Sequence, residues 1–201
     1  MSPRRRLSRQ ESQERTRGRL LDTAAKEFLR RGYHGTSLDR VAELAGYSKG
    51  AVYSNFESKE ELCLAVLDRH YGEQFVALSN ELAVAERTPE ARIAAVQPWW
   101  EKLASEQDWR LLETEVILQA RFSKRLRSTL VRRQRSARNF VAQLLEEQRE
   151  ELGLTLPFSP DHLAVALLGL GAAIATQRVF EPDLPPEILT ETIGALLNRP
   201  S

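Results

Sequence analysis

Apolar residues recur at three- and four-residue spacing along most of the chain, which is the period of an amphipathic α-helix. The first such stretch covers residues 10–31 and is followed by Gly32, a residue that ends helices readily. Two short stretches follow, 37–44 and 48–55, and Gly46 between them allows the positive φ of a tight turn. No alternating strand pattern interrupts the chain, so the sequence predicts an all-α fold.

Helix start signals divide the rest of the chain. Ser58 with Glu61 forms a capping box that opens a long helix. Pro89 and Pro160 occupy first helical positions, and two prolines at 185 and 186 indicate the start of the last helix. The expected helices span residues 58–85, 89–105, 108–120, 123–151, 160–179 and 185–198, which gives about nine in all.

Composition excludes several classes of protein. The 201 residues are 42% hydrophobic and 28% charged, as in folded globular chains. One cysteine, Cys63, excludes a disulfide framework and a cysteine-rich metal cluster, and its helical setting suggests a buried small hydrophobe. The longest apolar run, Leu163–Ala175, has 13 residues and is shorter than the ~20 of a membrane helix. No apolar stretch follows the N-terminal charges, so a secretory signal is not expected and the cytoplasm is the expected location. We also expect no membrane association and no cofactor.

The formal net charge of +1 hides an asymmetry. The first 60 residues carry 13 Lys/Arg against 8 Asp/Glu, whereas the remainder carries 16 against 20. A basic arm precedes the first helix, and such an arm is typical of nucleic-acid binding, although a solvated tail is the alternative. A second basic block, residues 121–138, contains no acid.

The segment 38–56 has the layout of a helix-turn-helix. Ala42 is small where the two helices cross, and Val52 fills the core that they share. The second helix of the motif carries small, hydrogen-bonding or cationic side chains, as suits a helix whose N-terminal end enters the major groove. A helix hairpin buried in an ordinary bundle is the alternative.

Residues 17–67 closely resemble the DNA-binding domain of the TetR family of bacterial transcriptional regulators. The matching elements are Leu21 through Phe28, Gly32-Tyr33, Thr36-Ser37, Val41-Ala42, Ala45-Gly46, Ser48-Lys49-Gly50, Val52-Tyr53, Asn55-Phe56 and Ser58-Lys59-Glu60 with Leu62. Tyr47 stands where the family usually has a small aliphatic residue, and Asn55 where histidine is frequent. Neither departure affects the expected fold, but both could alter operator preference.

The resemblance implies roles for individual residues. Ser48 through Ala51 would face the groove, and Thr36, Tyr53, Asn55 and Lys59 would bind phosphates. We further expect the basic arm to enter the adjacent minor groove. The predicted DNA-binding residues are Thr36, Ser37, Arg40, Tyr47, Ser48, Lys49, Gly50, Ala51, Tyr53, Ser54, Asn55 and Lys59, together with Arg4, Arg5 and Arg6 of the arm.

The resemblance also implies two domains, residues 1–57 for DNA binding and 58–201 for effector binding and dimerisation. The helix over 160–179 is apolar nearly all round, so it needs burial on both sides, against its own core and against a partner subunit. A wholly internal core helix is the alternative. The predicted dimer-interface residues are Leu167, Leu168, Gly171, Ala172, Ile174, Ala175, Ile193, Leu196 and Leu197.

An effector pocket is expected among the middle helices, lined by aromatic and polar side chains. The predicted ligand-binding residues are Trp100, Trp109, Glu113, Val116, Phe122, Phe140, Gln143 and His162. An aromatic core with solvated polar faces is the alternative for most of them. For the basic block we expect ion pairs with Glu106, Asp108, Glu113 and Glu115; attraction of an anionic effector and steering toward DNA are the alternatives.

An enzyme is not expected. The three histidines are scattered, and no metal-binding pair, nucleophile elbow or phosphate loop occurs in the sequence. We therefore interpret the chain as a ligand-responsive regulator, a repressor, that binds a palindromic double-stranded DNA operator as a homodimer and is released by an unknown small-molecule effector. A DNA-bound regulator controlled by a protein partner, or bound constitutively, is the alternative function.

Overall fold

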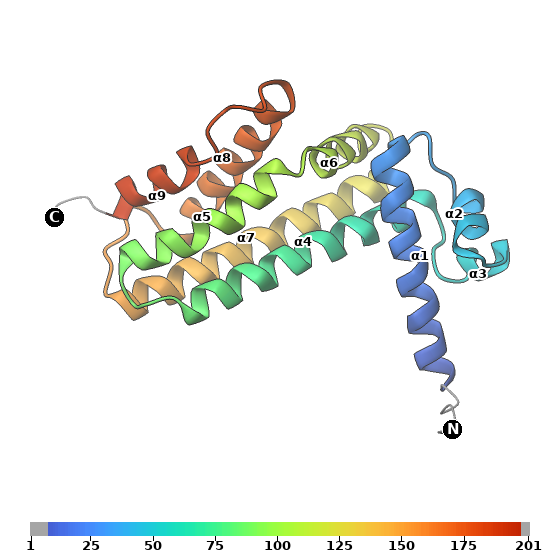
Figure 1. The fold of residues 1–201 in the computed structure, drawn as a ribbon, viewed down its shortest axis with the longest axis horizontal. Helices are drawn as coiled ribbons and strands as arrows, with labels where there is room; N and C mark the ends of the chain where they lie inside the picture. Colours follow the sequence, from blue (N-terminus) through green and yellow to red (C-terminus); the bar gives the residue numbers. More distant parts are fainter. Residues whose placement is uncertain (1–7, 198–201) are drawn as a thin grey trace. The chain divides into compact units, whose positions relative to one another are not determined.

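The computed structural model describes residues 8–197, except for the side chain of Leu197. Within this range the chain is all-α, as expected, and it forms nine helices (Figure 1). They are α1 (Arg9–Arg31), α2 (Leu38–Ala45), α3 (Lys49–Tyr53), α4 (Lys59–Val84), α5 (Pro89–Ser105), α6 (Gln107–Gln119), α7 (Lys124–Leu152), α8 (Pro160–Phe180) and α9 (Ile188–Leu197).

Most helix ends lie within one or two residues of the predicted positions because local caps determine them. The hydroxyl oxygens of Ser37, Ser48 and Ser123 accept backbone N–H groups at the starts of α2, α3 and α7. Gly46 has φ 72° and ψ 31°, and its N–H donates back to the last turn of α2. A side chain at Gly46 would be strained in this left-handed conformation.

The start of α9 differs from the prediction. The helix begins at Ile188 and not at the two prolines. A residue that precedes proline is disfavoured in the helical region, which counts against helix at Pro185. In addition, the carbonyl of Pro186 accepts the indole N–H of Trp100 at 2.7 Å, a contact that no local sequence signal reveals.

The chain divides into two compact units. The first runs through His70 and includes Leu112–Val116 of α6; it therefore extends past residue 57, the boundary that the resemblance implied. Its core is formed by side chains that are almost fully buried, and α2 and α3 lie beside α1 (Figure 1). These core residues are Leu20, Ala24, Phe28, Val41, Ala42, Val52, Phe56, Leu62, Cys63, Val66, Leu67, Leu112 and Val116.

The second unit holds Tyr71–Leu111 and the chain from Ile117 onward. Its core joins α5, α8 and α9 through Trp100, Ala104, Ile174 and Leu189. Gly171 packs directly on Trp100, since a Cβ at this glycine would lie 3.3 Å from the indole ring.

Helix α8 is long and apolar but poorly covered. Its most apolar 18-residue window has a mean hydropathy of 1.7 and is only 22% buried. By length and composition alone, α8 is the one helix of the described range that would suffice to cross a membrane, a test that core helices also pass. Val165 is 50% exposed, and the neighbouring Ala166, Gly169 and Ala173 are also exposed.

Candidate nucleic-acid interface

The α2–turn–α3 segment has the geometry of a helix-turn-helix. Gly46 turns the chain, and the N–H of Tyr47 donates to the carbonyl of Ala42 at 2.9 Å. Ser48 then caps α3 by accepting the N–H of Ala51 at 3.2 Å. Three residues thus separate the end of α2 from the start of α3, a connection that fixes the direction of the second helix.

Tertiary contacts hold α3, which is too short to be stable alone. Val52 and Phe56 are 0% and 1% exposed. From α1, the guanidinium of Arg17 donates to the carbonyl of Asn55 at 3.0 Å and lies 4.3 Å from the centre of the Phe56 ring. Sequence reasoning did not identify this role of Arg17, because the contact joins residues 38 positions apart.

The opposite side of α3 is open. Ser48, Lys49 and Gly50 are exposed, and Tyr53 is 52% exposed. A Cβ added at Gly50 would meet only the Ser48 hydroxyl, at 3.9 Å. The N-terminal end of α3 therefore offers a surface on which another backbone can approach closely, as a helix end in a major groove requires.

Three of the side chains predicted to bind phosphates or the groove donate hydrogen bonds to backbone carbonyls of the protein itself. The hydroxyl of Thr36 is buried and donates to the carbonyl of Gly32 at 3.0 Å, which counts against a phosphate contact by this side chain. Ser54 and Asn55 both donate to the carbonyl of Ala51, at 2.9 and 2.8 Å. These two side chains close the end of α3 in this structure.

The three cations of residues 36–59 also have partners. Lys49 pairs with Asp39, and Arg40 pairs with Glu43 at 2.8 Å. Lys59 donates to the carbonyl of Tyr33 at 3.0 Å and lies 4.4 Å from the centre of its ring. The predicted minor-groove residues Arg4, Arg5 and Arg6 lie outside the described residues.

Local contacts shift the pKa of two tyrosines near the motif. Hydrogen bonds from Thr16 and then Arg19 of α1 lower the pKa of Tyr47, which shows that its hydroxyl faces α1. Burial, followed by the nearby carboxylate of Glu60, raises the pKa of Tyr33 far above its usual value.

Glu115 of α6 contacts the end of α1 within the first unit. Its Oε2 accepts the backbone N–H of Tyr33 at 2.6 Å. The carboxylate also covers Gly32, where an added Cβ would lie 2.8 Å from Oε1 and where φ is 70°. We expected Glu115 to form an ion pair with the basic block. In the structure its carboxylate instead binds the backbone N–H of Tyr33.

The structure does not gather the predicted effector-binding residues into one described cavity. Trp100 belongs to the core, Val116 is fully buried in the first unit, and Phe122 is 80% exposed. Of the remaining residues, Trp109 and Glu113 are half-buried and Gln143 is exposed and donates to Glu147.

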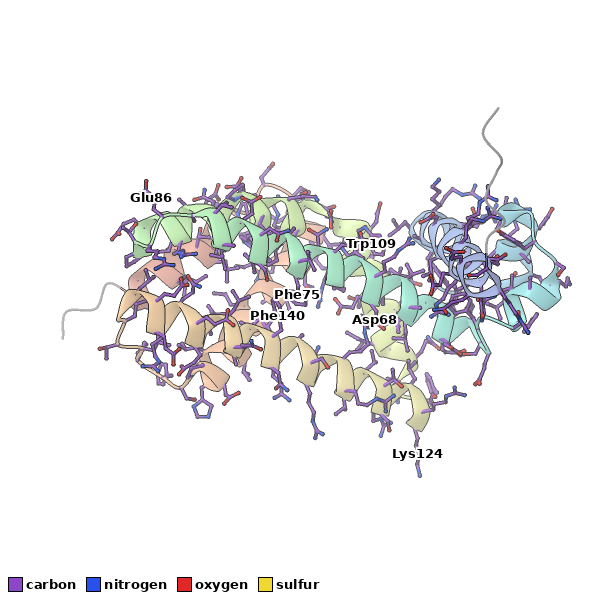
Figure 2. All side chains as sticks on the ribbon, turned by 90° about the horizontal axis from the view of Figure 1, so that it is seen from below. Asp68, Phe75, Glu86, Trp109, Lys124 and Phe140 are labelled. Carbon is purple, nitrogen blue, oxygen red and sulfur yellow. The ribbon has the colours of Figure 1, made fainter. Side chains whose placement is uncertain are left out.

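Two features of the second unit are relevant to an effector. The rings of Phe75 on α4 and Phe140 on α7 face each other, with centres 4.7 Å apart (Figure 2). A surface pocket of about 360 Å³ opens between α7 and α8, and it includes the predicted residue His162. Its lining residues are Arg135, Arg138, Asn139, Asp161, His162 and Val165.

The basic block is largely unpaired. Within the described chain, none of its residues Arg121, Lys124, Arg127, Arg132, Arg135 and Arg138 forms an ion pair with an acid. Lys124 extends away from the ribbon at the start of α7 (Figure 2). The expected pairing with neighbouring acids is thus absent for these six.

The predicted dimer residues divide into inward and outward positions. Gly171 and Ile174 are buried in the core of their own subunit, and Leu167, Ala175 and Ile193 pack against that core. A nearly uniform apolar helix gives no sign of which side faces inward, so the sequence did not separate these five from positions open to a partner, and their place in a dimer interface stays a prediction. Leu168, Ala172 and Leu196 are half-buried, and the side chain of Leu197 lies outside the described residues.

A capped and anchored helix-turn-helix, in an all-α chain with a second helical unit, defines a helix-turn-helix transcription regulator. Residues 20–66 match the family model described as "Bacterial regulatory proteins, tetR family". Over 174 residues, which are 83% of this chain and 87% of the relative, the sequence is 31% identical to the transcriptional repressor NemR of Escherichia coli. The protein belongs to the TetR family of bacterial transcriptional regulators, and it is not an enzyme.

Other relatives align with a smaller part of the chain. The chain is 36% identical over 97 residues to the transcriptional activator FasR of Mycolicibacterium smegmatis, covering 48% of this chain and 44% of FasR. It is 43% identical over 63 residues to the regulator TtgR of Pseudomonas putida, covering 31% of this chain and 30% of TtgR. The chain therefore aligns with less than half the length of these two relatives.

Solved structures share the whole fold. A TetR-family regulator from Rhodococcus has a TM-score of 0.76 at 18% identity, covering 92% of this chain and 100% of that one. The reduced form of Escherichia coli NemR has a TM-score of 0.72 at 24% identity, covering 93% of this chain and 99% of that one. At such identities the likeness concerns the fold alone.

Proposed function

We propose that the protein is a ligand-responsive repressor in the bacterial cytoplasm that binds a palindromic operator as a homodimer and is released by a small-molecule effector. NemR is a transcriptional repressor and aligns with most of this chain, which supports repression as the direction of regulation. FasR, which aligns with 48% of this chain, is an activator, so whether this protein represses or activates has to be measured separately.

The observation that carries the DNA-binding site is the open N-terminal end of α3. Val52 and Phe56 fix the helix from inside, while Ser48, Lys49 and Gly50 stand free of the core. Glycine at this exposed position lets a phosphate backbone or a base edge come close, and the neighbouring hydroxyl and ammonium groups supply hydrogen bonds.

Gly50→Leu tests this site. Since no protein atom lies within 3.9 Å of an added Cβ and φ at Gly50 is not positive, the variant should fold and melt like the parent protein. Bound to DNA, the larger side chain would occupy the space of the ligand. Operator affinity, measured by fluorescence anisotropy on a duplex recovered by in vitro selection, should fall by about 100-fold, equivalent to two good base contacts.

Gly72→Leu is the matched control. Gly72 is an exposed glycine of α4 with open space around it, so this variant should keep both stability and operator affinity. If Gly50→Leu binds the operator as tightly as the parent protein, α3 is not the helix that reads the DNA sequence.

We assign dimerisation to the outward face of α8, with Val165, Ala166, Gly169 and Ala173 at its centre. The small residues let a second helix approach closely, and burial of this face would cover the apolar surface that the chain leaves exposed. In a two-fold dimer the two α3 helices would read successive major grooves about 34–36 Å apart.

Ala173→Arg places a charge on this face. It should convert the dimer to monomer in sedimentation or light scattering and weaken operator binding. Ala83→Arg, at an exposed alanine of α4, is the control and should leave the dimer intact. If the Ala173→Arg variant is still a dimer, the dimer interface does not lie on the outward face of α8.

Effector control is proposed through the second unit. Binding there would shift α5–α7 against α4, which begins in the first unit and ends in the second, and would change the spacing of the two α3 helices. A coupling free energy of about 1–3 kcal/mol suffices for a 5- to 150-fold change in operator affinity.

A thermal-shift screen of a metabolite library, followed by operator titration with each stabilising compound, tests this control. At least one compound should raise Tm and weaken operator binding. If none does so, a protein-controlled or constitutively bound regulator becomes the better description.

A further inference from the structure

An exposed row of residues runs along the outward face of α8 from Ala166 to Phe180. Ala166, Gly169, Ala173 and Phe180 follow one another at helical spacing, with Gln177 as the one polar member of the row. Phe180 is 84% exposed. A continuous apolar row that the subunit itself does not cover indicates a surface for a partner.

A surface pocket of about 360 Å³ lies at the start of the same helix, between α7 and α8. Arg135 and Arg138 line it, and neither forms an ion pair within the described chain. Its one acid is Asp161, and Val165 supplies an apolar wall. The pocket thus combines apolar surface with an excess of positive charge, and guanidinium groups pack favourably on an aromatic ring.

Acidic side chains follow the opposite end of α8. Residues 179–198 contain no lysine or arginine and four acids, Glu181, Asp183, Glu187 and Glu191. Among the described residues, none of these four forms an ion pair. Arg178, the cation just before this segment, donates to two backbone carbonyls of its own subunit. The surface around α8 is therefore basic where the helix begins and acidic where it ends.

This charge polarity favours one arrangement of two α8 helices. In a two-fold dimer the same face of each copy meets the other, and the two helices run either parallel or antiparallel. A parallel pair brings acid to acid and arginine to arginine. An antiparallel pair brings the acidic end of each copy to the arginines of the other, and it is favoured because like charges that meet at an interface oppose binding.

The small residues indicate the register of the antiparallel pair. The backbones can approach most closely where Gly169 of one copy crosses Ala173 of the other, which places the centre of symmetry at position 171. Phe180 lies nine positions after this centre, and His162, which lines the pocket, lies nine positions before it. At the shallow crossing angle of about 20° that bundled helices adopt, Phe180 of each copy therefore reaches the pocket of the other.

We propose that the pocket between α7 and α8 receives Phe180 of a second copy of this chain, an inference that rests on the proposed function because it specifies the α8 dimer interface. The ring packs on Val165 and on the stems of the two arginines, and the neighbouring Glu181 pairs with Arg138. Two-fold symmetry repeats the contact, so each dimer contains it twice. The ion pairs exclude the parallel arrangement of the two helices.

Phe180→Ala tests the aromatic contact, with the dimer dissociation constant measured by sedimentation equilibrium. The constant should rise by at least about 30-fold, the effect of losing one interface hot spot. Because Phe180 is exposed in the single subunit, the variant should keep the helix content of the parent protein in circular dichroism. Phe122→Ala, at a phenylalanine of the α6–α7 turn that is 80% exposed, is the matched control and should leave the constant unchanged.

Charge reversal tests the ion pair. Glu181→Arg should raise the dissociation constant by at least about tenfold, since it brings like charges together. Arg138→Glu, added to that variant, restores opposite charges and should recover most of the lost affinity. Glu86→Arg makes the first reversal at an exposed acid between α4 and α5, and it should have no effect.

Cross-linking tests the antiparallel arrangement. Phe180→Cys and His162→Cys each introduce one accessible cysteine, because Cys63 is fully buried. At concentrations that favour the dimer, a short bis-maleimide should join the two variants to each other when they are mixed, and should join neither variant to itself. Self-linking of either variant indicates a parallel pair and overturns the inference.

The outcomes separate this inference from the proposed function. Dimers that survive Phe180→Ala and Glu181→Arg, while Ala173→Arg gives monomers, overturn the inference and leave the α8 interface intact. If Arg135→Glu with Arg138→Glu leaves the dimer intact but abolishes thermal stabilisation by phosphate or citrate, the pocket binds a small anion, and the inference is again overturned. A monomeric parent protein, or a dimer that survives Ala173→Arg, refutes the α8 interface and the docking of Phe180 with it.

Discussion

Glu115→Ala should destabilise the protein through a single long-range hydrogen bond. In the parent protein, the carboxylate accepts the N–H of Tyr33 at 2.6 Å, in a partly buried setting. A hydrogen bond to a charged group contributes about 1.5–3 kcal/mol, and the alanine variant also leaves this N–H without an acceptor. We expect a loss of about 2 kcal/mol in the free energy of unfolding, or about 4–8 °C in Tm for a chain of this size.

Two comparisons isolate the carboxylate. Glu115→Gln keeps an acceptor oxygen without the charge and should lose about 1 kcal/mol, since neutral hydrogen bonds are roughly half as strong. Glu81→Ala removes an exposed glutamate from α4 and should stay within about 0.5 kcal/mol of the parent protein. Urea unfolding followed by far-UV circular dichroism measures all three, and a Glu115→Ala curve that overlays the Glu81→Ala curve would refute the assigned bond.

Gly32 provides a second check on the same contact. An alanine there would suffer both from φ 70° and from a Cβ only 2.8 Å from Glu115 Oε1. In a Glu115→Ala background the collision disappears, and only the backbone strain remains, about 1–3 kcal/mol for a non-glycine residue at φ 70° and ψ 176°. Gly32→Ala should therefore be less harmful in that background, and strictly additive losses would contradict the geometry.

Other contacts give shorter predictions. Arg17→Met removes the donor to the Asn55 carbonyl and should weaken operator binding at least fivefold with a loss of about 1 kcal/mol in stability, which titration and melting measure together. Arg92→Leu removes the donor to the carbonyl of Leu82 and to Glu151, whose side chain is 40% exposed, and should lower stability by about 1 kcal/mol in urea unfolding. The raised pKa of Tyr33 means that its neutral form stabilises the fold fully below pH ~10, so stability should fall as pH rises further. Tyr33→Phe should flatten that alkaline loss, and an unchanged pH profile would contradict the assignment.

The helices were predictable because their ends are local. Ser37, Ser48 and the glycine at 46 carry caps and turns that involve only residues within five positions, so the sequence contains the whole signal. The start of α9 was mispredicted: the proline pair at 185 and 186 disfavours helix at Pro185, and the indole of Trp100, 86 residues away, donates to the carbonyl of Pro186. The exposed end of α3 followed from its polar composition together with the family resemblance.

Long-range side-chain pairs were not predictable in the same way. The bond between Glu115 and Tyr33 spans 82 residues, and the ion pair between Lys49 and Asp39 crosses a turn that the sequence does not place in three dimensions. The buried hydroxyl of Thr36 is a similar case, because composition gives no measure of exposure. The effector-site residues stay a prediction for the same reason, since a cavity depends on the packing of many helices.

The separation of buried from exposed positions in and around α3 affects how this regulator can evolve. Within a span of nine residues the positions that hold the helix, Val52 and Phe56, are distinct from those that stand free, Ser48, Lys49 and Gly50. Mutations at Lys49 and Gly50 can accumulate with little cost to the fold, whereas Ser48 also caps α3 and can be exchanged without such a cost only for another capping residue. Descendants of one ancestral gene can thus acquire new DNA targets by drift and selection at a few surface codons, while the scaffold beneath stays the same.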